Sequence, residues 1–332
     1  MTITDSERAT RPVRARRAVW HVVLWLLVLP GLAWVAVRFG GWERGLLVQL
    51  FAFTPYVAAW SVIPLVLALI GRRWLLAALA ALTVAGLAVA VLPRSLADAD
   101  RGPQTGVRVT VMTSNMLFGN ADATELVRLV RDNDVAVLAV QEFSPQAQTN
   151  LAAAGLGDLL PYTTLGAEAG ASGSGLYSRF PLADAAVRRN GAGFNQAYAT
   201  VRAPGAVAIQ VESAHPAAPY AISALGDWRS DLEAQPRADP DGAPRILLGD
   251  FNSTLDHKPL RDLIAGGYRD AAAATGDGLV GTWGPYDGDP IPPVTIDHVL
   301  TDERIGVVST AVHGITGTDH RAIIAEVVLP AA

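Results

Sequence analysis

The chain of 332 residues contains no cysteine, which excludes disulfide bonds, cysteine-ligated metal centres and thiol catalysis. Lysine is almost absent as well, because Lys258 is the single lysine among 26 basic residues. Schiff-base chemistry therefore has almost no candidate residue, and no G-x-x-x-x-G-K-[ST] phosphate-binding loop occurs. Charged residues make up only 17% of the chain against 51% hydrophobic residues. This balance is too apolar for a wholly soluble enzyme and excludes a disordered chain.

The apolar excess is concentrated near the N-terminus. Residues 18–38, 46–70 and 74–93 are three runs with almost no charge, each about as long as a helix that crosses a hydrocarbon core of about 30 Å. Six of the eight tryptophans fall in this region, several near the ends of the runs, as in an interfacial aromatic belt. A cleaved signal peptide would explain the first run but not the other two. The sequence therefore predicts a three-helix transmembrane anchor over residues 18–93.

The arginines predict the orientation of this anchor. Residues 1–17 form an arginine-rich leader, and Arg72 and Arg73 lie between the second and third runs. The loop between the first and second runs offers mainly Arg44, which Glu43 offsets. The positive-inside rule then places the N-terminus in the cytoplasm and the chain after the third run outside. We therefore expect a multi-pass plasma-membrane protein with an extracytoplasmic C-terminal part.

Beyond a linker over residues 94–105, residues 106–332 have the pattern of one globular α/β domain. Helical spacing predicts helices near 123–133, 222–234 and 257–265. Residues 1–94 carry a net charge of +7, and residues 95–332, with 16 basic and 28 acidic residues, carry −12. A domain this acidic has no obvious electrostatic footprint for nucleic acid. Alternating or buried apolar runs predict strands at 106–115, 135–140, 207–215, 245–250, 294–300 and 322–328.

Polar residues gather where two of the predicted strands end. Ser114 and Asn115 close the first strand, and Gln141 and Glu142 follow the second. A carboxylate just past a buried strand lies at the rim of a sheet, where oxygen ligands can hold a hard cation. Taken alone, each pair is more often an ordinary turn or capping group than a metal site.

Two later segments carry groups that suit proton transfer. His215 ends the strand near 207–215, and a lone histidine of this kind has a structural alternative. Asp250 and Asn252 follow a buried strand, after Gly249, which allows a sharp turn. Asp250 could take a proton from water while Asn252 donates a hydrogen bond to a phosphoryl oxygen. An ordinary Asp/Asn turn is the alternative interpretation.

The last segments each place an aspartate before a histidine: Asp297-His298 and Asp319-His320. An aspartate that orients an imidazole and stabilises its protonated form is the arrangement used in general acid–base catalysis. Adjacent residues on a strand face opposite ways, so Asp297 is expected to serve His320 rather than His298. We interpret the remaining histidines as structural, namely His298, His257, His313 and His21.

In their order along the chain, these segments resemble the motif series of the endonuclease/exonuclease/phosphatase superfamily. The resemblance covers about residues 106–329 and depends on Q-E, G-D-F-N, I-D-H-V and T-D-H in that order. It implies an α/β four-layer α/β/β/α sandwich with a site at one end. The carboxylate that partners the first histidine in some nucleases has no clear match, although Glu168 lies near the right stretch.

The same resemblance implies a role for each residue. Glu142 matches the principal Mg²⁺ ligand, with Mn²⁺ as an alternative metal, and Asn115 and Asp319 match further positions at the metal site. Asp250 matches the residue that activates or positions the attacking water, and Asn252 the one that holds the phosphate. The Asp–His pair and the second histidine of the nuclease-like members are matched by Asp297, His320 and His215.

The layout of leader, anchor and outward domain resembles the VanJ/StaP-type membrane proteins of actinobacteria, which are associated with teicoplanin resistance. That resemblance implies a cell-envelope phosphatase acting on a lipid-linked phosphate, with undecaprenyl pyrophosphate as the natural substrate. Alternatives are a tethered extracellular nuclease, which the negative charge disfavours, and a sphingomyelinase-like phosphodiesterase, whose membrane-binding hairpin is not evident. A non-catalytic binder of a cell-wall intermediate or antibiotic is a further alternative, which the intact motifs disfavour. The sequence leaves the oligomeric state open.

Overall fold

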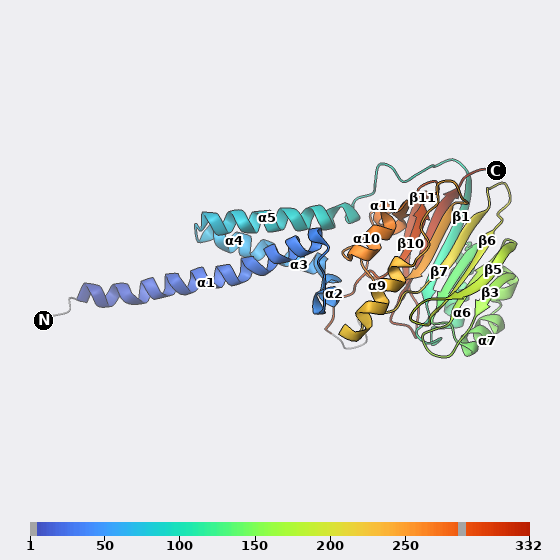
Figure 1. Ribbon diagram of the computed structural model, residues 1–332, viewed down its shortest axis with the longest axis horizontal. Helices are drawn as coiled ribbons and strands as arrows, with labels where there is room; N and C mark the ends of the chain where they lie inside the picture. The colour runs from blue at the N-terminus through green and yellow to red at the C-terminus, as the bar shows by residue number, and fades with distance from the viewer. Residues whose placement is uncertain (1–4, 285–289) are drawn as a thin grey trace. The chain divides into compact units, whose positions relative to one another are not determined.

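The computed structural model of the chain describes residues 5–284 and 290–332 (Figure 1). The chain forms two compact units. The helical unit runs to Glu43 and resumes over Phe53–Leu92, and the sandwich unit consists of Arg44–Ala52 and Pro93–Ala332. The first four residues of the arginine-rich leader lie outside the described part of the chain.

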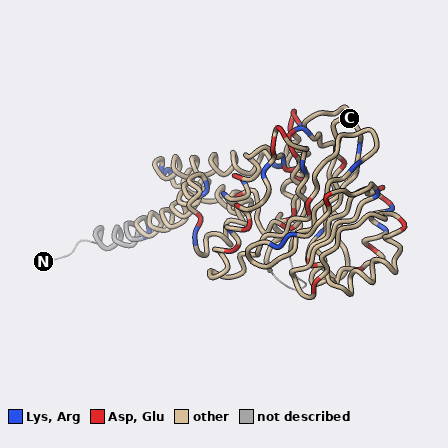
Figure 2. Tube along the Cα trace, turned by 45° about the vertical axis from the view of Figure 1, so that its right-hand side comes forward, with Lys and Arg blue, Asp and Glu red and all other residues tan. Residues whose placement is uncertain are grey.

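Four helices make up the helical unit: α1 (Asp5–Gly40), α3 (Thr54–Trp60), α4 (Val62–Ile70) and α5 (Trp74–Val91). Figure 2 shows long stretches without charge in this unit. Small residues let α1 and α5 approach closely, since a Cβ added at Gly31 would lie 2.9 Å from Cγ2 of Thr83. The buried side chains between the helices include Leu24, Val28, Ala68, Leu76, Ala77 and Ala80.

Two helical segments among the described residues are long and apolar enough to cross a membrane, Ala18–Gly40 and Trp74–Ser95. The predicted middle span over 46–70 is not confirmed, because the structure divides that run. Its first part forms α2 (Leu46–Phe51), which belongs to the sandwich unit. The remaining apolar helical segment, Thr54–Ile70, is shorter than the other two. A helix of 17 residues rises 1.5 Å per residue and is only about 25 Å long.

The sandwich unit contains two six-stranded sheets. Sheet A has the strand order β11-β12-β1-β2-β4-β3, and sheet B has the order β5-β6-β7-β8-β10-β9. The strands of sheet A are β1 (Val107–Asn115), β2 (Val137–Gln141), β3 (Tyr162–Gly166), β4 (Ser174–Ser178), β11 (Gly306–Gly314) and β12 (Arg321–Leu329). Those of sheet B are β5 (Leu182–Arg189), β6 (Asn195–Val201), β7 (Ile209–Ala214), β8 (Arg245–Asp250), β9 (Tyr268–Asp270) and β10 (Asp297–Asp302).

Each sheet contains one parallel pair, and its other neighbouring strands are antiparallel. β1 and β2 are parallel in sheet A, and β7 and β8 are parallel in sheet B. A parallel pair requires a crossover connection, usually a helix. The crossover in sheet A contains α6 (Ala123–Asp132), and the one in sheet B contains the 3₁₀ turn η2 (Ile222–Ala224) followed by α9 (Leu225–Glu233).

The two sheets pack face to face, and helices cover their outer faces. Successive residues of a strand point to opposite sides, so Val111 packs between the sheets while Met112 packs under the outer helices. Leu247 of sheet B likewise faces outward, into a cluster that includes Trp228 of α9. This is the mixed α/β, two-sheet architecture that the resemblance implied. The other helices are α7 (Pro145–Ala153), α8 (Leu156–Leu159), α10 (Lys258–Ile264), α11 (Ala271–Thr275) and the 3₁₀ turn η1 (Leu92–Ser95).

Buried hydrogen bonds join the two sheets at the end where the parallel strands finish. Nε2 of Gln141, the last residue of β2, donates to Oγ of Ser213 in β7 across 2.9 Å. The Ser213 hydroxyl in turn donates to the carbonyl oxygen of Val140 at 3.1 Å. Because each of these groups is buried and bonded, the two sheets hold a fixed relation at this end.

Candidate active site

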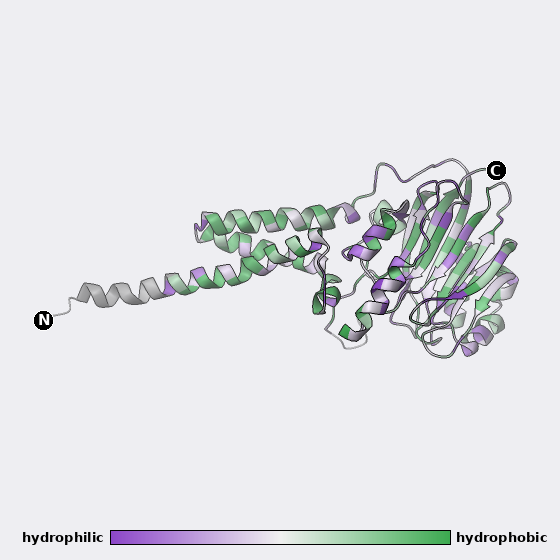
Figure 3. Cartoon of the chain, viewed as in Figure 1, coloured by the Kyte–Doolittle hydropathy of each residue, from purple (hydrophilic) through white to green (hydrophobic). Residues whose placement is uncertain are grey.

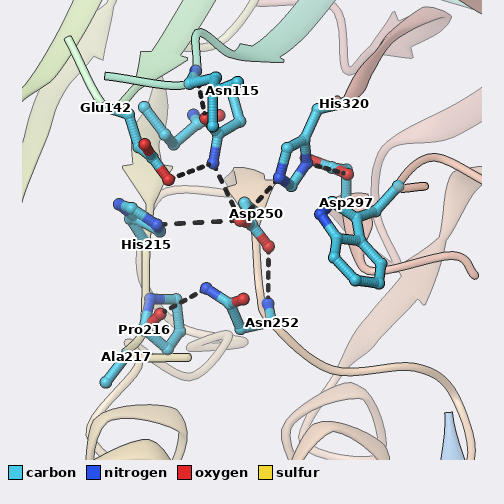
Figure 4. Close-up of polar contacts among 12 residues, drawn as sticks. Asn115, Glu142, His215, Pro216, Ala217, Asp250, Asn252, Asp297 and His320 are labelled. Atoms are coloured by element: carbon cyan, nitrogen blue, oxygen red, sulfur yellow. Dashed lines mark hydrogen bonds and ion pairs between the residues drawn. The ribbon is translucent and has the colours of Figure 1, made fainter. Parts of the chain in front are cut away.

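The predicted site residues come together at one end of the sandwich (Figure 4). The parallel strands β1, β2, β7 and β8 finish there, and the antiparallel strands β10 and β12 begin there. Strand ends that are far apart in the sequence thus become neighbours in space. The residues at or next to these ends are Asn115, Glu142, His215, Asp250, Asp297 and His320.

Asp250 lies at the centre of this group. Its Oδ2 accepts a hydrogen bond from Nδ2 of Asn115 at 3.0 Å. The same oxygen lies 3.7 Å from Nε2 of His320 and 3.8 Å from Nε2 of His215. Its Oδ1 accepts the backbone N–H of Asn252 at 2.8 Å. One carboxylate therefore faces two imidazole rings and one amide, and its orientation is fixed by the loop that follows β8.

Burial has opposite effects on the pKa values of Asp250 and His215. Desolvation raises the pKa of the Asp250 carboxyl to about 7, with the charge of His320 partly offsetting it. Desolvation, followed by the charge of His320, lowers the pKa of His215 to about 3. Asp250 can therefore exchange a proton near neutral pH, and the His215 ring is neutral there. This separation of pKa values is typical of groups with different roles in acid–base chemistry.

Asp297 and His320 form a buried hydrogen-bonded pair. Nδ1 of His320 lies 2.9 Å from Oδ2 and 3.1 Å from Oδ1 of Asp297. Burial alone would lower the pKa of His320, but the carboxylates of Asp297 and Asp250 outweigh it and raise the pKa to about 10. His320 is therefore an imidazolium at neutral pH, with Nε2 directed toward Asp250. The expected partnership of Asp297 with His320 is the one observed.

Glu142 follows β2 in a left-handed backbone conformation, with a φ of 52°. This conformation is uncommon for a residue with a side chain and often marks a functional site. Oε1 of Glu142 accepts from Nδ2 of Asn115 at 3.1 Å, and Oε2 accepts from the backbone N–H of Phe118 at 2.8 Å. Burial raises the pKa of Glu142, partly offset by these donors. The strained turn thus directs a carboxylate into the group.

Asp319 contributes a further carboxylate, whose charge acts on Glu142. Its Oδ2 accepts the indole N–H of Trp283 at 2.6 Å. Its Oδ1 is buried and has no hydrogen-bond partner among the described residues, and it lies 4.0 Å from Nε2 of His320. A buried carboxylate oxygen without a donor is costly unless a cation or water satisfies it.

These oxygens fit a divalent cation. Carboxylate and amide oxygens are the ligands of Mg²⁺ and Mn²⁺, and Oδ1 of Asp319 accepts no hydrogen bond from the part of the chain that the structure describes. Ligand atoms of Asp250, Asp297 and His320 also lie within 4.8 Å of one another and could hold a metal ion. In that triad, however, Asp297 and His320 are hydrogen-bonded to each other. Among the described residues, the carboxylates of Glu142 and Asp319 could hold a cation without breaking that pair.

Asn252 is the other site residue in a left-handed conformation, with a φ of 48°. Its side chain donates from Nδ2 to the carbonyl oxygen of Pro216 at 3.0 Å. Its own carbonyl oxygen accepts the indole N–H of Trp228 at 3.1 Å. The loop after β8 is thus attached both to the loop after His215 and to α9, so Asn252 is held next to Asp250.

The remaining candidate residues have structural partners. Nδ1 of His298 lies 2.7 Å from Oδ2 of Asp270, and Nε2 of His257 lies 2.7 Å from the carbonyl oxygen of Val48. These contacts agree with the structural interpretation of both histidines. Glu168 does not serve His215, because its Oε2 accepts from Arg189 and from Nδ2 of Asn195.

Two residues that matter to the site were not predicted from the sequence, Trp283 and Phe194. Trp283 holds Asp319, and the ring of Phe194 packs edge-on against His215 with centroids 4.9 Å apart. Nδ1 of His215 has no hydrogen-bond partner among the described residues. Trp283 is one of two tryptophans in residues 95–332, and no motif or spacing in the sequence indicates its role.

Comparison with known proteins agrees with this geometry. The profile of the Endonuclease/Exonuclease/phosphatase family matches residues 112–320, which include every residue of the group described above. No curated protein sequence matches the chain.

Solved structures with the same fold have low sequence identity to the chain. A Beutenbergia cavernae endonuclease/exonuclease/phosphatase structure is 19% identical, with a TM-score of 0.53, and the match covers 67% of this chain and 72% of that one. For humanized Danio rerio TDP2 the identity is 15%, the TM-score 0.52, and the coverage 66% and 98%. Truncated Caenorhabditis elegans TDP2 is 16% identical, with a TM-score of 0.51, and the match covers 67% of this chain and 97% of that one. At such identities the likeness is one of fold.

Proposed function

Because the chain belongs to the Endonuclease/Exonuclease/phosphatase family, we propose that it is a membrane-anchored, metal-dependent hydrolase of phosphoric esters or pyrophosphates. The observation that carries this proposal is the position of Asp250, whose Oδ2 lies 3.7 Å from Nε2 of His320 and 3.8 Å from Nε2 of His215. A base and a protonated imidazole beside an oxygen-rich cation site are what hydrolysis of a negatively charged phosphoester needs.

In this mechanism, Asp250 orients a water molecule and takes its proton, since a pKa of about 7 suits a general base at neutral pH. His320, which Asp297 keeps protonated, donates a hydrogen bond to the negative charge that develops on the phosphoryl group. Asn252 and neutral His215 orient the remaining phosphoryl oxygens. The desolvated environment strengthens each of these interactions relative to water.

Glu142 and Asp319 would hold Mg²⁺, or alternatively Mn²⁺, with Asn115 beside them. When bound, the cation neutralises charge on the phosphate and stabilises the leaving oxygen. Asn115 links the two parts of the site, because its Nδ2 donates to both Glu142 and Asp250. A shift of Asn115 would therefore change the cation position and the base position together.

The substrate we propose is a lipid-linked pyrophosphate, with undecaprenyl pyrophosphate as the first compound to test. Two apolar helical segments of membrane-spanning length support it, because an anchored site acts most readily on a substrate held in the same bilayer. The net charge of −12 over residues 95–332 supports it too, because polyanionic nucleic acid would be repelled.

The proposed topology is a cytoplasmic N-terminus, a multi-pass anchor and an extracytoplasmic sandwich unit. The segment Arg44–Ala52 belongs to the same compact unit as Pro93–Ala332, so both must lie on one side of the membrane. Residues 53–92 therefore enter and leave on that side, and Ala18–Gly40 separates it from the leader. The arginines of the leader then favour an outward site. We also propose a role in the cell envelope linked to teicoplanin resistance, because the predicted layout of leader, anchor and outward domain resembles that of the VanJ/StaP type.

The decisive experiment measures phosphate release from undecaprenyl pyrophosphate by the full-length protein in detergent with Mg²⁺. His320→Ala and a chelator are the blanks. Release that both blanks abolish establishes the activity, and no release at any metal concentration contradicts it. An export-dependent reporter fused after Ala332 should be active and one fused after Arg73 inactive, and the opposite pattern would place the site in the cytoplasm.

A tethered nuclease is the second candidate. It is favoured by the nuclease-type positions that converge in the site, namely His215, Asp250 and His320. Protein that leaves undecaprenyl pyrophosphate intact but nicks plasmid DNA in the presence of Mg²⁺ would support the nuclease and reject the lipid phosphatase.

A further inference from the structure

A short helix that interrupts the apolar N-terminal part of the chain is integral to the sandwich unit. Val48 and Phe51 of α2 are buried at 1% and 0% exposure, and Val48 joins the cluster that contains Trp228. The carbonyl oxygen of Val48 lies 2.7 Å from Nε2 of buried His257. Nε2 of Gln49 donates to the carbonyl oxygen of Pro219 at 2.8 Å. α2 is thus attached to two separate loops of this unit.

The opposite face of α2 is apolar and exposed. Leu46, Leu47 and Leu50 are 62%, 37% and 47% exposed, and residues three and four apart lie on one face of a helix. The loop that Gln49 contacts continues with Tyr220 and Ile222, which are 82% and 61% exposed. Figure 3 shows α2 and the start of α9 next to each other, both largely hydrophobic. We call Leu46, Leu47, Leu50, Tyr220 and Ile222 the apolar rim.

The rim is also free of charge. Residues 45–53 and 216–226 contain no acidic or basic residue, although the chain from residue 95 onward carries 28 acids. Exposed leucine, isoleucine and tyrosine side chains grouped in this way are unfavourable in water and mark a surface that binds an apolar partner. Tyrosine at such an edge is typical of the boundary between a membrane and water.

The position of α2 in the sequence identifies that partner. α1 ends at Gly40 and α3 begins at Thr54, so α2 lies between two apolar helices of the proposed anchor. A connection of five residues or fewer spans at most roughly 18 Å, which keeps α2 at the bilayer surface. Neither a second copy of the chain nor a peptide ligand is constrained to this place, whereas a lipid leaflet is.

The rim is connected to the site by a short piece of chain. His215 is followed directly by Pro216, whose carbonyl oxygen accepts from Asn252 at 3.0 Å. From His215 to Tyr220 is five residues, at most roughly 17 Å of extended chain. When the rim is inserted in a leaflet, His215 therefore lies within this distance of the rim. A lipid-linked phosphate at the headgroup level can then reach the site.

Building on the proposed function, we propose that the apolar rim inserts into the outer leaflet and sets the depth at which the site meets a lipid-linked phosphate. The apolar side chains of α2 and of the loop 216–222 replace contacts with water by contacts with acyl chains. His215 and Asn252, attached to that loop, are thereby held beside the headgroups.

The absence of cysteine makes a direct test straightforward. Ile222→Cys and Leu50→Cys, each labelled with a nitroxide in the full-length protein in phosphatidylcholine–phosphatidylglycerol vesicles, should collide more with oxygen than with a water-soluble nickel chelate. Val187→Cys on β5, 36% exposed, is the matched control and should show the opposite preference. If the labels at positions 222 and 50 are as accessible to water as the control label, the proposed insertion of the rim into the leaflet is wrong.

A second readout separates this inference from the proposed function. Tyr220→Ser combined with Ile222→Ser should lower about tenfold the ratio of turnover of vesicle-bound undecaprenyl pyrophosphate to turnover of a water-soluble phosphodiester, because two apolar side chains leave the bilayer. Lipid-phase labels with no hydrolysis of the lipid substrate support the rim and reject that substrate. A different outcome is hydrolysis of the lipid substrate together with water-exposed labels and an unchanged ratio. That outcome would contradict insertion of the rim and support the proposed function.

Discussion

Nδ1 of His320 lies 2.9 Å from Oδ2 of Asp297, so this pair forms a direct hydrogen bond between a buried imidazole and a buried carboxylate. The bond orients the ring so that Nε2 faces Asp250 at 3.7 Å. Burial would lower the pKa of His320, but Asp297 and then Asp250 raise it to about 10. The proton on His320 therefore depends on its partner, and the pair acts as a unit.

Replacing Asp297 with Asn should separate these effects. The amide keeps the shape of the side chain but removes the charge that most strongly raises the pKa of His320. We expect kcat to fall about 10²- to 10⁴-fold and the upper limb of the pH–rate profile to move to lower pH. Steady-state rates between pH 5 and 11 measure both. A lower rate with an unmoved upper limb would mean that Asp297 does not set the protonation of His320.

The pH–rate profile of the unsubstituted protein should be bell-shaped. Asp250 acts as a base only after losing its proton, so the rate should rise with pH through about 7, the pKa to which burial raises it. His320 acts only while protonated, so the rate should fall as pH rises through about 10. Desolvation lowers the pKa of His215 to about 3, so it contributes no limb in this range. Activity that is highest at pH 5 would contradict the assignment of Asp250 as the base.

Glu142→Gln should abolish the response to metal. Mg²⁺ at a hundred times its dissociation constant stabilises a one-site protein by about 2.7 kcal/mol, or roughly 5–10 °C in Tm for a domain of this size. We expect that shift in the unsubstituted protein and almost none in the variant, as measured by thermal unfolding with and without Mg²⁺. Glu168→Gln is the matched control, since Glu168 pairs with Arg189 at the surface and should keep the full shift.

Trp283→Phe tests the support that Asp319 receives. The indole N–H of Trp283 donates to Oδ2 of Asp319 at 2.6 Å, and phenylalanine has no such donor. Loss of a hydrogen bond that orients a ligand typically lowers metal affinity 10- to 100-fold, which titration of activity against Mg²⁺ concentration would show. Trp228→Phe is the comparison, because the Trp228 indole donates to Ser253 Oγ and to the carbonyl oxygen of Asn252 but not to Asp319. Its rate can fall, but its Mg²⁺ requirement should stay within about threefold. Equal effects of both variants would indicate general loosening of the fold.

The sequence predicted the site better than it predicted the anchor. The site residues lie at or next to strand ends, as Asn115, Glu142, Asp250 and His320 do. The end of a strand can be predicted from where its apolar run stops. What the pattern could not show was the cross-sheet contact between Asn115 and Asp250, because it depends on how two sheets pack.

The second apolar run shows why the anchor was harder. Residues 46–70 contain no charged residue, but Val48 is buried in a core cluster of the sandwich unit rather than in a spanning helix. Hydropathy measures the preference of a side chain for leaving water, and a protein core satisfies that preference as well as lipid does. Trp283 was missed for a related reason, since its hydrogen bond joins positions 36 residues apart.

A buried ion pair gives the last prediction. Arg94, in η1, donates from Nη1 and Nη2 to both carboxylate oxygens of Asp256 at 2.7 and 2.6 Å. The side chains are 8% and 0% exposed, and Asp256 lies in the loop that continues from Asn252. Removing one partner leaves the other charged and buried, which typically costs 3–5 kcal/mol.

We therefore expect Arg94→Met to lower the Tm of the full-length protein by roughly 10 °C, as measured by thermal unfolding in detergent. Asp256→Asn keeps a neutral acceptor for Arg94 but leaves the guanidinium without its counter-ion, so it should lower the Tm by a similar amount. Combining Arg94→Met with Asp256→Leu removes both charges, and the double variant should be more stable than either single variant because no unpaired ion stays buried. A double variant that loses the full sum of the two single effects would show that the pair contributes no coupling. In that case the loop after β8 would be held in place by contacts that do not involve η1, such as the bonds of Trp228 and His298 to Ser253.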